Sequence, residues 1–166
     1  IYDAGGAFVA AVGGPKDLTR PSSVTVSPDG SRIYVLDTGG VDNNQHRIVV
    51  FDAAGRRVNV IGKRGGGAGE FNLPLAIERA PDGGLYVVDT GNFRVQKLSA
   101  DGAPLSGFGK PGRYPGQFGH PKDVALDVSA ALPPAPPPPA LALVDAVLAL
   151  PPALVAVVPV SGALLH

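Results

Sequence analysis

The chain has 166 residues, with 14 basic and 14 acidic side chains and therefore no formal net charge. This balance gives no electrostatic reason to expect a nucleic acid or an anionic membrane as partner, since both attract an excess of positive charge. Cysteine is absent, which excludes disulfide bonds, thiolate metal sites and a cysteine nucleophile.

Composition divides the chain into two regions. Every Lys and Arg lies at or before Lys122, and from 128 to 166 the only charged side chain is Asp145. The apolar run 146–160 is interrupted by prolines and is shorter than the roughly 20 residues that a membrane-spanning helix needs. We expect no transmembrane segment. No basic, apolar leader opens the sequence, so we also expect a mature form or a fragment.

Short strands separated by turn residues are predicted from residue 24 to residue 108. Apolar and β-branched residues form the strands, and Asp-Gly sequences mark several of the turns. No helical periodicity is present. The predicted strands are Val24–Val26, Arg32–Leu36, Arg47–Phe51 and Arg57–Ile61 in a first unit, and Ala76–Glu78, Leu85–Val88, Arg94–Leu98 and Pro104–Phe108 in a second.

The units repeat at a nearly constant interval. Pro21, Pro74 and Pro121 each open a unit, with spacings of 53 and 47 residues, and the glycine-rich connector 62–73 matches 109–120. A four-stranded unit of this length cannot bury both of its faces alone, and its repetition is typical of a propeller blade. We therefore predict an all-β chain, a partial β-propeller ring of four-stranded antiparallel blades with about three to three and a half blades present. A β-sandwich is the alternative, but sandwiches do not repeat their turns at a fixed period.

The whole chain is assigned to one propeller domain. Residues 1–20 are predicted to end a preceding blade and to link it to the next, because Tyr2–Gly6 repeats the turn sequence at Phe51–Gly55. Residues 21–73 and 74–120 form the two clear blades.

Residues 121–166 are predicted to form a degenerate third blade. Leu141–Asp145 would be its second strand and Leu154–Val158 its third, with a proline-rich loop at 133–139. The strands lack polar alternation. Three interpretations stay open: a divergent blade, a GC-rich gene translated in a shifted frame, or residues assigned without identified side chains.

Several motifs resemble the NHL repeat family. They are Gly-x-Phe-x-x-Pro before a blade, Asp-Gly before its second strand, Tyr-Val-x-Asp-Thr at the end of that strand, and Asn-x-Arg-Val-Gln, which residues 92–96 match in full. The resemblance covers about residues 1–127. It implies a propeller, often of six blades, that acts as a binding platform. Residues 117–127 look most similar to exported bacterial six-bladed propellers, which implies a periplasmic or extracellular setting.

The resemblance also implies a structural brace in each blade. The family's aspartates at the end of the second strand bond to backbone or to the arginine that opens the third strand. Here these pairs are Asp37 with Arg47 and Asp89 with Arg94. Repetition favours a structural role, since a catalytic residue is needed once. Six blades would need about 280 residues, so we expect missing sequence or assembly with another chain that covers or closes the arc.

The loop 39–46 is the predicted recognition surface. It offers carboxylate, amide and imidazole groups, and Phe93 in the second blade is added to it. A calcium or transition-metal site is the alternative, but the loop lacks the spacing of a dedicated calcium loop. The predicted interaction residues are Asp42, Asn43, Asn44, His46 and Phe93.

These features predict a non-enzymatic interaction or scaffold module with a protein partner, without catalytic, metal or cofactor-binding residues. The alternative is a propeller similar to peptidyl-α-hydroxyglycine lyases, which hold zinc through histidines that follow the blade-opening proline. The corresponding residues here are Ser22, Leu75 and Lys122, so a lyase site would have to lie in other blades. RNA binding ranks third, because Lys and Arg are scattered among equal numbers of acids.

Overall fold

The computed structural model describes residues 1–40, 43–127 and 154–159. These residues contain strands joined by turns, with one short 3-10 turn, η1 (Thr90–Asn92). The predicted all-β class is confirmed. The strands are β1 (Pro21–Val26), β2 (Arg32–Asp37), β3 (Arg47–Asp52), β4 (Arg57–Ile61), β5 (Pro74–Arg79), β6 (Leu85–Asp89), β7 (Arg94–Leu98), β8 (Pro104–Phe108), β9 (Pro121–Asp127) and β10 (Leu154–Pro159).

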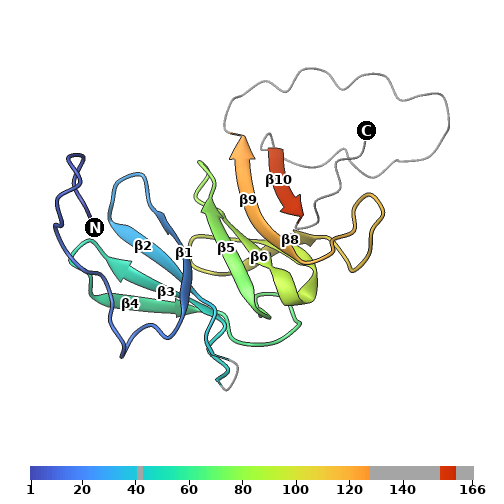
Figure 1. The fold of residues 1–166 in the computed structure, drawn as a ribbon, viewed down its shortest axis with the longest axis horizontal. Coiled ribbons are helices and arrows are strands. Elements are labelled where there is room, and N and C mark those ends of the chain that lie inside the picture. Colours follow the sequence, from blue (N-terminus) through green and yellow to red (C-terminus); the bar gives the residue numbers. More distant parts are fainter. Residues whose placement is uncertain (41–42, 128–153, 160–166) are drawn as a thin grey trace.

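Two four-stranded antiparallel sheets follow one another along the chain, as predicted for propeller blades. Their strand orders are β1-β2-β3-β4 and β5-β6-β7-β8. Asp37 pairs with Arg47 across β2 and β3, and Asp89 pairs with Arg94 across β6 and β7, so the two sheets share one register. The sheets lie side by side, and no ring is closed within the part of the chain that the structure describes (Figure 1).

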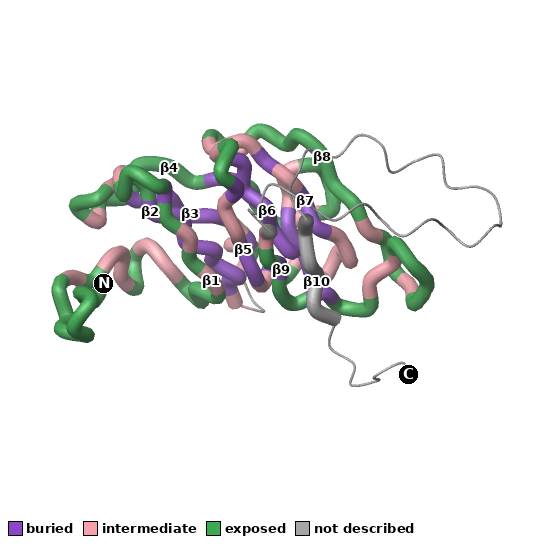
Figure 2. The backbone as a smooth tube through the Cα atoms, turned by 90° about the horizontal axis from the view of Figure 1, so that it is seen from above, coloured by how far each residue is buried: buried purple, intermediate pink, exposed green. Residues whose placement is uncertain are grey.

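Core residues lie on both faces of the two sheets because both faces of each second strand are apolar. Tyr34 and Leu36 of β2 pack with Leu85 and Val87 of β6 in one buried cluster. Alternation along a strand sends every other residue to the opposite face. Tyr86 and Val88 of β6 therefore join a second cluster against Val124 of β9, and Ile33 and Val35 of β2 join a third with Val12 and Leu18. Burial is concentrated in the two middle strands of each sheet, which are β2, β3, β6 and β7. By contrast, β8 is exposed along its length (Figure 2).

Each connector between blades inserts one phenylalanine beside a glycine. Phe71 is fully buried in the cluster between the sheets. A Cβ on Gly62 would collide with the Phe71 ring, and the φ of Gly62 is 79°. Gly109 and Phe118 repeat this arrangement with a φ of 103°. Glycine is required at both positions for space and for backbone conformation, which explains the repeated nine-residue spacing of the two pairs.

The third sheet differs from the expectation. Leu154–Val158, expected as the third strand of its blade, lies in β10, which pairs directly with β9 in a two-stranded antiparallel sheet. It thus takes a place adjacent to the first strand, which β2 and β6 hold in the other sheets. The predicted second strand Leu141–Asp145 and the proline-rich loop 133–139 lie outside the described residues.

Replacement of Phe71 by alanine is expected to lower the free energy of unfolding by about 3–5 kcal/mol, because it leaves a cavity between the sheets. The control is Phe8→Ala, since the Phe8 side chain is 66 % exposed and its loss should change stability little. Urea unfolding followed by circular dichroism measures both variants. Equal urea midpoints for the two would contradict the inter-sheet core.

Candidate functional site

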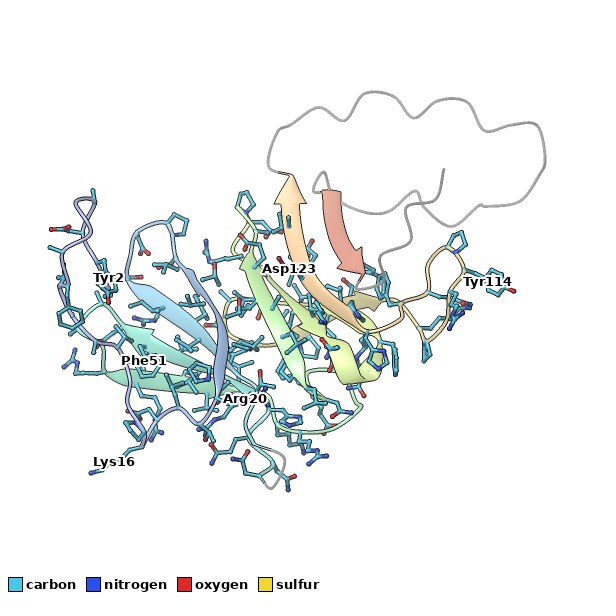
Figure 3. The ribbon with its side chains drawn as sticks, in the orientation of Figure 1. Tyr2, Lys16, Arg20, Phe51, Tyr114 and Asp123 are labelled. Atoms are coloured by element: carbon cyan, nitrogen blue, oxygen red, sulfur yellow. The ribbon has the colours of Figure 1, made fainter. Side chains whose placement is uncertain are left out.

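The loops that join the sheets lie at one end of the blades, which we call the connector end. Pro21 pairs with Asp37 and Pro74 pairs with Asp89, so each first strand begins where the second strand ends. Lys16 and Arg20 mark this end of the first sheet (Figure 3). The described loops of the connector end are residues 13–20, 38–40, 43–46, 62–73, 90–93 and 109–120.

Asp89 is fully buried at this end and is surrounded by N–H donors. Its carboxylate accepts hydrogen bonds from the Asn72 backbone N–H (2.6 Å), Arg94 Nε (2.8 Å), Asn92 Nδ2 (2.9 Å) and Gln96 Nε2 (3.1 Å). A buried carboxylate is costly unless it is paired and hydrogen-bonded, and here both oxygens are engaged. The donors come from the connector, η1 and β7, so Asp89 joins three segments.

Asp37 holds the same place in the first sheet with a looser arginine contact. It accepts hydrogen bonds from the backbone N–H of Arg20 (2.7 Å) and of Thr19 (3.1 Å). Arg47 Nη2 lies 3.4 Å from Asp37 Oδ2 but 2.9 Å from the carbonyl oxygen of Asp17. The structure therefore brings both predicted aspartate–arginine pairs together, and we propose that each braces its blade to the preceding connector.

A second repeated contact links neighbouring blades. The Thr38 hydroxyl donates to the carbonyl oxygen of Pro74 at 2.6 Å, and the Thr90 hydroxyl donates to that of Pro121 at 2.7 Å. Each threonine follows the buried aspartate and reaches the first residue of the next blade. Sequence reasoning missed this role, and missed that of Gln96. The signal that could have revealed the first is the repeat of the Asp-Thr pair itself.

His46 and Phe93 occupy one position in the repeat, directly before Arg47 and Arg94. His46 Nδ1 accepts the Leu73 backbone N–H at 3.1 Å, and the Phe93 ring lies 4.8 Å from the His120 ring. Leu73 and His120 themselves precede the prolines that open the next blades. Both have a left-handed backbone, with φ of 47° and 63°. The side chain at this position therefore holds the bend that leads into the next blade.

These contacts correct part of the predicted interaction loop. His46 is 1 % exposed, so it cannot contact a partner on the surface. Asn43 is half-buried, and its Oδ1 accepts the backbone N–H of Gly40 and Gln45. Asn44 is exposed and lies 3.4 Å from Arg64 Nη1, while Phe93 is half-buried. Asp42 lies outside the described residues.

The exposed charged side chains in the described loops of the connector end are basic. The carboxylates of its described loops, Asp17 and Glu70, lie in ion pairs with Arg57 and Lys63, each at 3.3 Å. The exposed cations are Lys16, Arg20, Lys63, Arg64, Lys110 and Arg113.

The turns at the opposite end of the blades carry aspartates. A hydrogen bond from the Ser27 hydroxyl lowers the pKa of Asp29 to about 2. The Lys97 ammonium bonds Asp82 at 2.7 Å and lowers the pKa of that carboxyl. Asp3 and Asp101 lie in the hairpin turns that end at Gly6 and Gly102. Arg32, Arg56 and Arg57 are exposed beside these turns, and Arg56 pairs with Asp52 at 2.7 Å, so both signs of charge occur at this end.

Two further observations concern the described part of the chain. It contains no group of three or more His, Cys, Asp or Glu side chains placed to hold a metal ion. It also contains no helix that is long and apolar enough to cross a membrane.

Comparison with known proteins yields partial likenesses. No family model matches the chain. A putative exported protein from Bacteroides fragilis is 20 % identical over 65 % of this chain and 27 % of its own, with a TM-score of 0.49. Hydrazine synthase from Kuenenia stuttgartiensis is 22 % identical over 65 % and 26 %, with a TM-score of 0.46. A Bacteroides caccae protein of unknown function is 16 % identical over 63 % and 34 %, with a TM-score of 0.39. The chain thus spans a quarter to a third of these proteins.

Replacement of Asp89 by asparagine is expected to lower the free energy of unfolding by on the order of 3 kcal/mol. The amide keeps the shape of the side chain but leaves Arg94 without its charged acceptor and turns an N–H group toward other donors. The matched control is Asp101→Asn in an exposed turn, which should be near neutral. Urea unfolding of both variants provides the measurement, and a near-neutral Asp89→Asn would remove the proposed brace.

The stability of the fold is expected to decrease in mild acid through His46. Burial lowers the pKa of this imidazole below its ordinary value of 6.5. The unfolded chain therefore binds a proton at a pH where folded His46 stays neutral. Stability from the neutral ring is complete above pH 6.5 and is lost as the pH falls through the folded-state pKa.

The measurement is the urea midpoint as a function of pH between about 7.5 and 5. A His46→Gln variant should show a flatter dependence than the parent chain, whereas His120→Gln, at an exposed position, should retain the parent slope. Identical slopes for all three chains would contradict this role of His46.

Proposed function

We propose that the chain is a segment of an NHL-type β-propeller that binds a protein partner through its connector end. The observation that carries this proposal is that the buried and the exposed polar groups at that end have different roles. Buried groups such as Asp37 and Asp89 are engaged in contacts between segments, and the exposed groups form a basic surface with aromatic and amide side chains. Such a surface suits recognition of an acidic protein face.

The aromatic side chains support the same assignment. Tyr114 lies in the connector 109–120 and is 76 % exposed, next to Arg113 and near Lys110 in sequence. Tyrosine and arginine are enriched among the residues that dominate binding energy at protein interfaces. We therefore place Tyr114, Arg113 and Lys110 at the centre of the contact. We also include Asn44 and Arg64, which lie at the connector end of the first blade.

A non-enzymatic role is part of this proposal. The most deeply buried carboxylates occur once in each blade, at the same register position, with the same kinds of donor. A reaction centre needs a single nucleophile, base or metal set, whereas a brace is needed in every blade. The setting that we propose is periplasmic or extracellular, on the resemblance of residues 117–127 to exported propellers.

A photo-reactive phenylalanine analogue at position 114 is expected to crosslink a protein partner. The matched control places the same group at Tyr2, which is 68 % exposed and lies far from Tyr114 (Figure 3). Crosslinking at position 114 and not at position 2 would support the connector end as the binding surface. The yield should fall several-fold in Lys110→Glu/Arg113→Glu and at raised salt, because screening weakens exposed charge pairs.

Two results would contradict the proposal. Crosslinking of RNA at position 114 would favour a nucleic-acid ligand, and equal crosslinking at both positions would show nonspecific contact. Urea unfolding of each variant establishes that the fold is retained.

A further inference from the structure

The face of the first sheet that is turned away from the second sheet is apolar and partly open. We call it the amino-terminal face; it comprises Val24, Val26, Ile33 and Val35. Val24 is 60 % exposed and Val26 is 49 % exposed. Residues 1–18 cover only part of it, and a groove of about 560 Å³ is lined by this face together with Val12 and Leu18.

The equivalent face is covered in each following sheet. Ile77 corresponds to Val24 and is 2 % exposed, and Val124 corresponds to it again and is 4 % exposed. In both cases the cover includes the second strand of the preceding sheet. Tyr34 and Leu36 lie in the cluster of Ile77, and Tyr86 and Val88 lie in that of Val124. The amino-terminal face thus lacks a cover that the same architecture supplies twice.

A polar contact is missing at the same place. The carbonyl oxygens of Pro74 and Pro121 each accept a threonine hydroxyl from the preceding blade. Pro21 opens the first blade at the equivalent position, and no side-chain hydroxyl among the described residues donates to its carbonyl oxygen. This acceptor borders the open groove, so an occupant of the groove could supply the hydroxyl.

Residues 2–12 have the geometry of the outer hairpin of a blade. Asp3 Oδ1 accepts the backbone N–H of Gly5 (2.9 Å) and Ala7 (2.8 Å). Asp52 Oδ1 accepts those of Ala54 and Arg56, both at 3.0 Å, in the hairpin between β3 and β4. Tyr2 and Phe8 form an antiparallel bridge across the first of these turns.

This hairpin also packs on the first sheet as β4 packs on the second. Gly102 of the second sheet lies against Ile61 at the end of β4. Its counterpart Gly55 lies against Ala11 and Val12, so that a Cβ on Gly55 would be 3.6 Å from the Ala11 carbonyl oxygen. Val12 then joins the cluster of Ile33 and Val35. The outer edge of the amino-terminal face is therefore occupied in the manner of an inter-blade contact, whereas the inner part is open.

We propose that the amino-terminal face receives the inner strands of the blade whose outer hairpin is residues 2–12. The occupant is an antiparallel sheet of this same repeat class, with apolar side chains at the positions of Tyr34 and Leu36. A threonine at the position of Thr38 donates its hydroxyl to the carbonyl oxygen of Pro21. This surface is distinct from the connector end; the inference rests on the propeller assignment in the proposed function and not on its protein partner.

The experiment joins a second copy of residues 21–49 to Ile1 of the full chain. Ile1 corresponds to Val50 in the repeat, so the copy continues into the existing hairpin in register. Amide hydrogen exchange of Val35 and Val49 is the readout, because exchange of core strands reports the stability of the unit that contains them. The copy is expected to slow exchange at both residues at least tenfold.

Three variants test the contact itself. Leu36→Asp in the added copy should abolish the slowing, and Thr38→Val in the copy should reduce it. Val24→Asp in the recipient should also abolish it, while leaving the unextended chain folded because Val24 is 60 % exposed there.

Two outcomes would overturn the proposal. One is exchange that is equally fast with the added copy and with its Leu36→Asp form. The other is an unextended chain that is dimeric by light scattering and becomes monomeric with Val24→Asp, which would assign the face to a second copy of this chain.

Discussion

The buried carboxylate at the end of each second strand is the constraint on which the architecture depends. Asp37 and Asp89 are both fully buried, and each collects backbone N–H donors from the connector that precedes its blade. A charge in that position is tolerated only when donors surround it. The carboxylate thus requires the connector to fold back against the sheet, and the adjacent threonine carries the link forward to the next blade.

The two copies of this arrangement differ where their loops differ. In the second blade η1 places Asn92 on Asp89, and Arg94 lies 2.8 Å from the carboxylate. In the first blade a longer loop places Gln45 beside Arg47, whose Nη2 is 3.4 Å from Asp37. The residue before the arginine has the same role in both blades. His46 and Phe93 each contact the last residue of the next connector. A loop that invites interpretation as a binding surface is therefore partly internal structure.

Strand positions and the antiparallel four-stranded sheets followed from local chemistry, and the structure confirms both. Runs of apolar and β-branched residues, turn residues and the repeat at 53 and 47 residues need no knowledge of distant contacts. The candidate site was less predictable. His46 was expected on the surface because it lies among polar residues, yet it is 1 % exposed and accepts the backbone N–H of Leu73, which is distant in sequence. The place of Leu154–Val158 also differed, because it pairs with β9 and not with a second strand.

The sequence by itself determined the all-β class, the two four-stranded units and the repetition of their aspartate, threonine and glycine positions, since these depend on short-range pattern. Only the tertiary structure decided which polar groups are consumed in holding the blades together and which remain for a partner. It also brought together, at the connector end, exposed Lys and Arg side chains from loops that are far apart in the chain. The reason is geometric: residues that are far apart in the chain share an end of the blade only because antiparallel strands return there.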